Sequence, residues 1–158
     1  MSYVKNLILI ATLVFIGISS SNASADADDF NLDYDDPANG ESSVDPDNTI
    51  EMKVQIENVV NQPMSFEMKI LNDDELQSSG IDVWWSHNGD DTLTSKSDTI
   101  PKVDVSDNSI KKGITVSIEA TENAVNGDYL INLRCKDKDS DAVSYTHLRA
   151  HETRDDLV

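Results

Sequence analysis

The chain has 158 residues and carries 30 acidic against 12 basic side chains, which gives a formal net charge of −18. This length allows one domain of ordinary size. The charge argues against nucleic acid and anionic membrane surfaces as partners, because both are recognised through a basic footprint. One cysteine cannot form a disulfide framework within the chain, and three histidines leave little for a zinc site.

Residues 1–25 have the pattern of a cleavable signal peptide. Lys5 supplies a positive start, Leu7–Ile18 is an uncharged apolar run, and Ala23-Ser24-Ala25 is a small-residue cleavage site. The apolar run is shorter than the roughly 20 residues that cross a bilayer as a helix, and the alternative is an uncleaved N-terminal anchor. We therefore expect a secreted, extracellular or cell-surface protein whose mature chain begins at Asp26.

Residues 26–47 form an acidic, turn-rich segment ahead of the main domain. Phe30, Leu32 and Tyr34 alternate with polar residues there, so we expect a short edge strand. Residues 48–142 then show the alternation of strands with one buried and one solvated face. The predicted strands are 49–58 and 64–71, taken as neighbours, and then 81–86, 100–105, 114–118 and 129–135.

The turns between these strands are rich in Asn, Asp and Gly, as in Asn88-Gly89 and Asn126-Gly127. Pro101 confines its strand to an edge or a strand start, and no stretch predicts a helix of convincing length. The fold class is therefore all-β, an antiparallel β-sandwich over 48–142 that follows the apolar leader.

Residues 143–158 differ abruptly in composition from the rest of the chain. They resemble the conceptual translation of a transposase-type sequencing adapter, and the alternative is a genuine polar tail. The resemblance predicts an unstructured artefact and a sandwich that is truncated at its C-terminal side, in a longer natural protein. Tyr145, His147 and His151 are accordingly not interpreted as metal ligands or as acid–base groups.

The order of several short motifs resembles a known group, the immunoglobulin-like modules of secreted archaeal and bacterial proteins, similar to the CARDB and alpha-galactosidase-associated domains. The resemblance covers about residues 42–136. Within it, residues 72–105 depart from the family pattern, because they contain more acidic insertions than that pattern has. The resemblance implies an immunoglobulin-like fold with a structural, spacer or adhesion role and no catalysis, and a corner or core role for Tyr129. The motifs are Val44–Ile50 before a strand ending at Asn58, Trp84 or Trp85, Ile110–Gly113 leading into Ile114–Ile118, and Gly127–Tyr129.

Catalysis has few candidate groups, and we expect no enzyme activity and no catalytic residue. His87 lies beside a predicted turn, and its sequence neighbours Ser86 and Asp90 do not create the geometry of a hydrolytic triad. Cys135 falls on the apolar phase of its strand, which favours a buried small hydrophobe over a reactive thiol.

Calcium is the one cofactor that the acidic clusters suggest, because hard cations take six to eight oxygen ligands. Asp137, Asp139 and Asp141 have the spacing that begins a calcium loop, but Ala142 stands where glycine is needed. The second cluster is Asp33, Asp35 and Asp36, followed by a proline. The alternative for both clusters is a solvated acidic surface.

Trp84 and Trp85 point to opposite faces of a strand, so at most one belongs to the core. The outward one is a candidate platform for a sugar ring or a partner protein, or is covered by a neighbouring loop.

The sequence as a whole supports three hypotheses for the function of the chain. The first is a non-catalytic surface module whose partners are extracellular proteins or neighbouring domains, the second is a carbohydrate- or partner-binding accessory domain of an extracellular hydrolase, and the third is a calcium-stabilised surface module.

Overall fold

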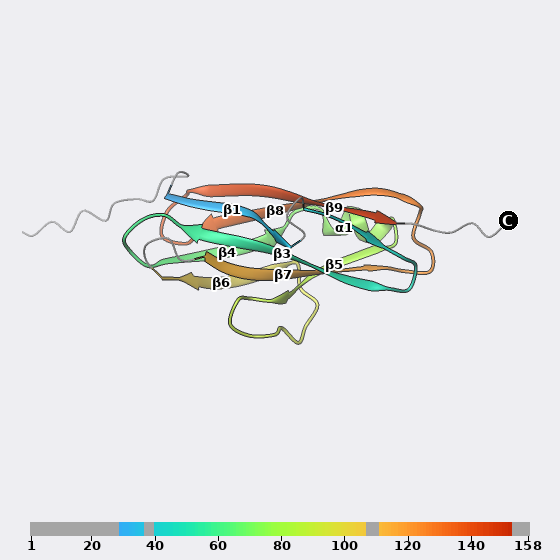
Figure 1. Cartoon of the computed structure of the whole chain (residues 1–158), viewed down its shortest axis with the longest axis horizontal. Helices are drawn as coiled ribbons and strands as arrows, with labels where there is room; N and C mark the ends of the chain where they lie inside the picture. The colour runs from blue at the N-terminus through green and yellow to red at the C-terminus, as the bar shows by residue number, and fades with distance from the viewer. Residues whose placement is uncertain (1–28, 37–39, 107–110, 153–158) are drawn as a thin grey trace, which may run out of the picture.

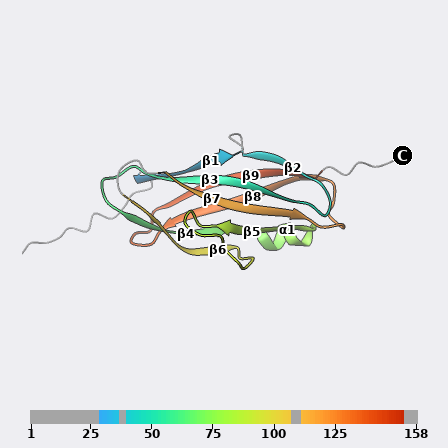
Figure 2. The same cartoon turned by 60° about the horizontal axis from the view of Figure 1, so that its bottom comes forward.

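The computed structural model describes residues 29–36, 40–106 and 111–152, and this part of the chain forms nine strands and one helix in two sheets. One sheet has four strands in the order β1-β3-β7-β5, and the other has five in the order β2-β9-β8-β4-β6. Figures 1 and 2 show the two layers lying face to face in an elongated body. The elements are β1 Phe30–Asp36, β2 Glu41–Val44, β3 Thr49–Asn58, β4 Met64–Ile70, α1 Asp73–Ser78, β5 Ile81–His87, β6 Thr99–Val105, β7 Lys111–Ala120, β8 Gly127–Asp137 and β9 Val143–Glu152.

This architecture is the expected all-β sandwich. The four-stranded sheet has the order of the A-B-E-D sheet of immunoglobulin domains, and β4, β8 and β9 take the places of its C, F and G strands. The chain departs from the usual order in the middle. After β4 it passes through α1 to β5 in the opposite sheet, and it then returns to β6 beside β4.

The core lies between the two sheets and is filled by the alternate apolar residues of the strands. In β4 every second side chain is buried, and in β3 the buried set includes Met52, Val54 and Ile56. The rings of Phe30 and Phe66 meet across the two sheets with centroids 4.7 Å apart and an angle of 52° between their planes, a favourable tilted arrangement. The period-two pattern thus specifies which face of each strand is buried.

Asn58 fixes the corner where the chain leaves β3 and crosses to the other sheet. Its side chain is fully buried, and Nδ2 donates to the carbonyl oxygens of Gln62 at 2.8 Å and Ser106 at 3.0 Å. Its Oδ1 accepts from the backbone N–H of Val60 at 3.0 Å. β3 and β4 therefore lie in different sheets, and the prediction that they are neighbours is wrong. Asn58 supplies backbone partners at a bend where no sheet can supply them.

The sandwich begins earlier than residue 48. β1 pairs with β3, and its Phe30 is fully buried in the common core. β2 pairs in parallel with β9, and its Val44 is 1% exposed. The segment 26–47 therefore supplies two strands of the sandwich from residue 30 onward. β1 is the edge strand that the alternation predicted, and it contributes to the core because its apolar residues all face the other sheet.

Residues 143–152 form β9, which corrects the expectation that they stay outside the fold. β9 pairs with β8 along its whole length. Its inward positions carry small or apolar side chains such as Leu148 and Ala150, whereas Tyr145 and His147 are exposed. The adapter resemblance concerns the origin of the codons, while the residues they encode alternate as a strand does. Residues 153–158 lie outside the described part, as does the expected leader.

Glu152 is the residue of β9 that fits its place least well. It is 2% exposed, and neither carboxylate oxygen has a hydrogen-bond partner among the described residues. Replacing Glu152 with leucine is expected to raise the free energy of unfolding by about 1–3 kcal/mol, because a desolvated polar group without a partner is removed. Urea unfolding measures the change. The matched variant Glu51→Leu, on the exposed face of β3, should stay within about 0.5 kcal/mol of the parent. Destabilisation by Glu152→Leu would contradict this reading.

The short helix α1 was not predicted. Three acidic residues, Asp73, Asp74 and Glu75, occupy its first turn, where their negative charges interact favourably with the positive end of the helix dipole. Leu76 is 3% exposed and anchors the helix, which ends before Gly80 at φ +83°. Six residues are too few for a clear helical period. None of the helices in the described part is long and apolar enough to span a membrane.

Tyr129 takes the corner role that the family resemblance implied. Its hydroxyl donates to the carbonyl oxygen of Val125, four residues earlier, at the start of β8. Burial, and then the nearby charge of Glu152, raise the pKa of the Tyr129 phenol, while the bond to Val125 acts in the opposite direction. The tyrosine thus holds the β7–β8 connection against the sandwich.

Candidate functional site

Trp84 and Trp85 lie on opposite faces of β5, as the alternation predicted. Trp85 is fully buried, and its Nε1 donates to the carbonyl oxygen of Asp98 at 2.9 Å. Trp84 is half-buried on the outer face, and the Lys96 ammonium lies 3.9 Å from its ring centre. Lys96 also pairs with Glu119 at 2.5 Å. The outward tryptophan is therefore covered by the loop that follows β5, which leaves little of it as a binding platform.

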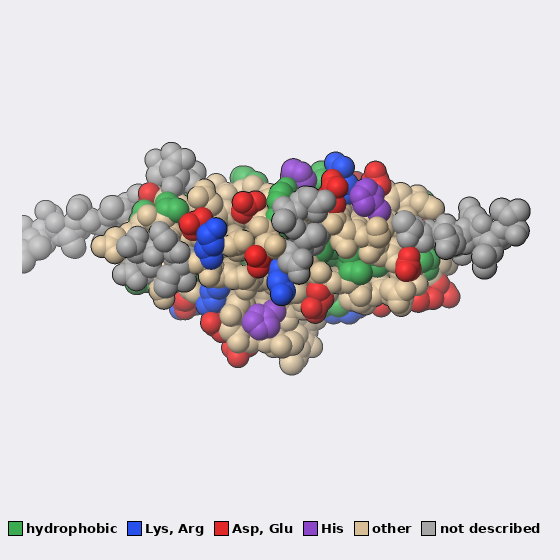
Figure 3. All heavy atoms as spheres, viewed as in Figure 1, with side chains coloured by type: hydrophobic (Ala, Val, Ile, Leu, Met, Phe, Trp, Pro, Cys, Tyr) green, Lys and Arg blue, Asp and Glu red, His purple; other side chains and the backbone are tan. Residues whose placement is uncertain are grey.

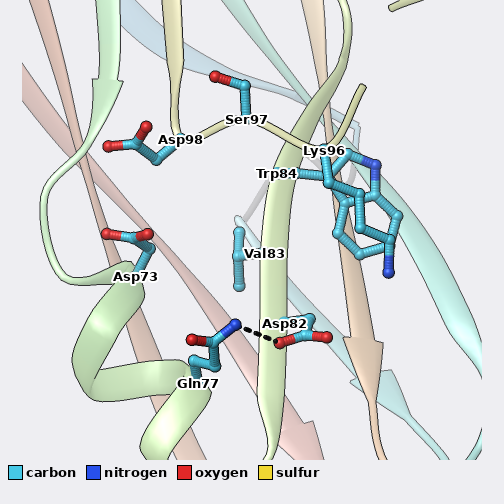
Figure 4. Close-up of a pocket in the computed structure, with 8 residues that line it drawn as sticks. All are labelled: Asp73, Gln77, Asp82, Val83, Trp84, Lys96, Ser97 and Asp98. Atoms are coloured by element: carbon cyan, nitrogen blue, oxygen red, sulfur yellow. Dashed lines mark hydrogen bonds between the residues drawn. The ribbon is translucent and has the colours of Figure 1, made fainter. Parts of the chain in front are cut away.

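A small hollow of about 140 Å³ lies beside Trp84, between β5, the start of α1 and the loop that carries Lys96. Figure 4 shows Asp73, Asp82 and Asp98 around it, with Gln77 Nε2 donating to Asp82 Oδ1 at 3.3 Å. The hollow is small and partly closed by the side chain of Lys96. A sugar ring stacked on Trp84 would have to displace that side chain.

Among the described side chains, the aspartates of the two candidate calcium sites do not form a gathered ligand set. Asp137 is 2% exposed at the end of β8, while Asp139 and Asp141 are exposed and Asp141 pairs with Lys136 at 3.4 Å. Across residues 29–36, 40–106 and 111–152, no three His, Cys, Asp or Glu side chains come together as a metal site would require.

The second cluster lies on β1, where Asp33 and Asp35 are exposed. Asp35 accepts a hydrogen bond from Gln55 Nε2 at 3.1 Å, and Asp33 Oδ1 accepts from the backbone N–H of Tyr34 at 2.8 Å. The Asp36 side chain lies outside the described part. Calcium binding thus stays a prediction from composition.

The histidines take part in local structure. His87 Nδ1 accepts from the backbone N–H of Gly89 at 2.9 Å, and Ser86 Oγ contacts the carbonyl oxygen of Thr115 instead of the imidazole. His151 contacts Asp128 across the β8–β9 ladder, and His147 lies with its ring 6.3 Å from that of Tyr34. None of these contacts joins a nucleophile to a base.

Cys135 is fully buried in β8, and burial, followed by the charge of Asp137, raises the pKa of its thiol. The folded state keeps this proton to higher pH than the unfolded chain does. The buried, protonated thiol of Cys135 therefore stabilises the folded state below a pH of about 8.5, and this stabilisation is lost as the pH rises. Between pH 8 and pH 10 we expect the parent to lose about 1–2 kcal/mol more than Cys135→Ala in urea unfolding. Equal losses in the two proteins would contradict a buried, protonated thiol.

Eight of the ten lysine and arginine side chains in the described part of the chain form ion pairs with carboxylates. Figure 3 shows Asp and Glu scattered among Lys and Arg on one face. Each pair is worth little by itself, because water screens it. Hydrogen bonds from Lys102, and then Ser65, lower the pKa of Asp104. Pairs in the described part include Lys69–Asp98, Lys96–Glu119, Lys102–Asp104, Lys111–Glu57, Lys112–Asp90, Arg134–Glu67, Lys136–Asp141 and Arg149–Glu41.

A groove of about 490 Å³ crosses the outer face of the four-stranded sheet. The register places Lys53 beside Thr115, and Thr115 beside His87, so one line of side chains runs across β3, β7 and β5. From the sequence, Asp35 is considered as a calcium ligand and Ser86 and His87 as catalytic groups, but the sequence does not predict that these residues lie together. The groove is lined by Asp35, Glu51, Lys53, Ser86, His87, Thr92, Gly113 and Thr115.

Comparison with known proteins reveals similar folds at low identity. No family model matches the sequence, and no curated protein matches it. Among solved structures, the CARDB domain of PF1109 from Pyrococcus furiosus is 14% identical, with a TM-score of 0.44, and the match covers 78% of this chain and 94% of that one. The ASH/PapD-like domain 7 of human CEP192 is 10% identical, with a TM-score of 0.49 and 98% coverage of both chains.

A family 123 glycoside hydrolase from Clostridium perfringens is 10% identical, with a TM-score of 0.48 over 72% of this chain. The match spans 23% of that enzyme. The structural neighbours include a CARDB domain, a PapD-like domain and a part of a glycoside hydrolase. With TM-scores below 0.5, these likenesses assign neither a family nor an activity to this chain.

Proposed function

We propose that the chain is a non-catalytic immunoglobulin-like module that acts as a structural spacer or adhesive element outside the cell. The observation that carries the proposal is the placement of the first and last strands. β1 begins at one end of the long axis, and β9 ends at the other (Figure 1). A module whose chain enters and leaves at opposite ends can be joined to its neighbours in an extended line.

The use of the reactive side chains supports this proposal. His87 stabilises its own turn, Cys135 is buried, and the hydroxyl of Tyr129 is bonded to backbone. Hydrolytic catalysis needs a nucleophile, a base and an orienting acid held together. In the described part of the chain, the side chains of His87, Cys135 and Tyr129 instead stabilise the folded structure.

The predicted leader supports an extracellular location of the protein. The acidic surface is compatible with this location because its negative charge favours solubility. Neighbouring domains of the same chain, or other extracellular proteins, are the partners that suit a spacer. Fusion of residues 1–25 to a reporter enzyme that is active only outside the cytoplasm tests the export step. Reporter activity that depends on the Leu7–Ile18 run is the expected result.

The spacer role is tested by joining two copies of residues 29–152 end to end and measuring small-angle X-ray scattering. An extended tandem should have a maximum dimension close to twice that of the single module. A compact tandem, or one in which the modules fold back on each other, would overturn the role. The same proteins assayed on chromogenic glycosides and esters should show no turnover above a buffer blank.

An accessory domain of an extracellular hydrolase is the second candidate, and a different observation favours it. The groove on the outer face of the four-stranded sheet is large enough for a small ligand. Ligand binding by this groove would support the accessory role, while the tandem measurement addresses the spacer role separately.

A further inference from the structure

We infer that the groove on the outer face of the four-stranded sheet binds a neutral polyhydroxylated ligand, of the class of mono- and disaccharides. Its volume of about 490 Å³ lies within the range of small-molecule sites, roughly 300–1,000 Å³. The inference concerns one face of the sandwich and is independent of the spacer role.

The floor of the groove is open because β7 carries a glycine there. A Cβ built on Gly113 would meet only Asp35 Oδ2, at 3.7 Å, an ordinary contact distance. A glycine within a strand weakens the strand, and it often marks a place where another group approaches the backbone. Thr115, two residues further along the same face, is 8% exposed. The ligand would therefore rest against backbone at Gly113.

The wall beside β5 is held in place by its own contacts. Gly89 has φ +95°, and a Cβ there would collide with the Lys112 side chain at 2.6 Å. Lys112 Nζ lies 2.5 Å from Asp90 Oδ2, and Asn88 Oδ1 accepts from the backbone N–H groups of Asp90 and Asp91. This turn fixes His87 at the edge of the groove. A wall that is ordered before binding lowers the entropic cost of binding.

Donors and acceptors both line the groove. Because His87 Nδ1 accepts from the Gly89 N–H, the neutral ring carries its proton on Nε2, which is then a donor. Lys53 offers an ammonium that forms no ion pair within residues 29–36, 40–106 and 111–152. Asp35 and Glu51 offer carboxylate acceptors. A hydroxyl group both donates and accepts, so adjacent hydroxyls can satisfy this mixture.

Charge argues against other ligand classes. An anion would meet two carboxylates on a chain whose formal charge is −18. A metal cation lacks a gathered ligand set in the described part and would face the Lys53 ammonium. An apolar ligand would leave the polar lining without partners. The lining includes no tryptophan, tyrosine or phenylalanine, so we expect a weak complex, with a Kd on the order of 1 mM.

The test is a ¹⁵N NMR titration of the full chain with glucose, galactose, N-acetylglucosamine and cellobiose. Saturable shifts confined to the amides of Lys53, His87, Gly113 and Thr115 are expected for at least one of these sugars. Gly113→Val should abolish them, because its side chain fills the floor of the groove, and its Tm should equal or exceed that of the parent, because valine suits a strand. Lys53→Ala should weaken binding about tenfold through loss of a charged hydrogen bond.

Gly127→Val is the matched control, since a Cβ at Gly127 would meet nothing within 4 Å and the residue lies outside the groove. It should bind as the parent does. The inference would be overturned by the absence of confined shifts with all four sugars, or by shifts that persist in a folded Gly113→Val protein. Tighter binding of glucuronate than of glucose would overturn the assignment to a neutral ligand.

Discussion

Replacement of Trp85 with alanine is expected to lower the free energy of unfolding by about 3–5 kcal/mol, the usual range for a large aromatic residue in a core. Trp85 is fully buried, and its indole N–H is bonded to the carbonyl oxygen of Asp98. The change therefore opens a cavity and leaves that carbonyl without its partner. Urea unfolding followed by circular dichroism measures the loss.

The adjacent tryptophan provides the control. Trp84→Ala removes a half-buried ring whose main neighbour is the Lys96 ammonium, a contact worth about 1 kcal/mol or less. Both variants lose the same number of atoms, so the difference between them isolates the face of β5 on which the ring lies. A loss at Trp84 as large as that at Trp85 would show that the two faces have been assigned wrongly.

Asn58→Ala is expected to destabilise the protein by about 2–4 kcal/mol. The substitution leaves three buried or partly buried backbone groups without a partner, and each such group costs about 1–3 kcal/mol when water cannot reach it. The three groups are the carbonyl oxygens of Gln62 and Ser106 and the N–H of Val60. Thermal and urea unfolding both measure the effect.

Asn72→Ala is the matched control at a more exposed bend. Asn72 Nδ2 donates to the carbonyl oxygen of Leu130 at 2.8 Å, and its Oδ1 accepts from the Asn132 N–H at 3.0 Å. Water can replace both bonds, so a loss of about 1 kcal/mol is expected. If the two asparagine variants lost equal stability, Asn58 would not be the special support of the inter-sheet crossing.

The sequence predicted strands more reliably than it predicted their partners. Alternation in 49–58 and 64–71 located β3 and β4, because the burial of one face depends only on local spacing. Pairing depends on where the chain crosses between sheets, and the alternation of a strand is the same in either sheet. That crossing depends on Asn58, whose polar side chain gives no local sign that it will be buried.

Composition misjudged the two ends of the described fold. The unusual composition of residues 143–152 and their resemblance to an adapter predict a segment outside the fold, although Leu148 and Ala150 fit the buried face of a strand. Around Phe30 the alternation predicts the strand β1, whereas the acidic composition places the segment outside the domain. In both segments the spacing of apolar residues was a better guide than net composition.

The groove could not be predicted because its lining comes from several strands. Asp35 belongs to β1, Lys53 to β3, Gly113 to β7 and His87 to β5, and only the register brings them together. The Trp84 platform, by contrast, was predicted from two adjacent residues, and its covering by Lys96 depends on a loop with no periodic pattern.

The parallel pairing of β2 with β9 has a mechanical consequence. These strands are matched over four residue pairs, from Glu41 opposite Arg149 to Val44 opposite Glu152. Tension applied to the two ends of the chain would pull β2 back toward β1 and β9 forward past Glu152, in opposite directions along their axes. The hydrogen bonds between them lie across the pulling direction, so they are loaded in shear and must break together. Because β1 precedes β2 and is paired with β3, this short parallel ladder would resist tension in shear after the β1–β3 ladder has parted.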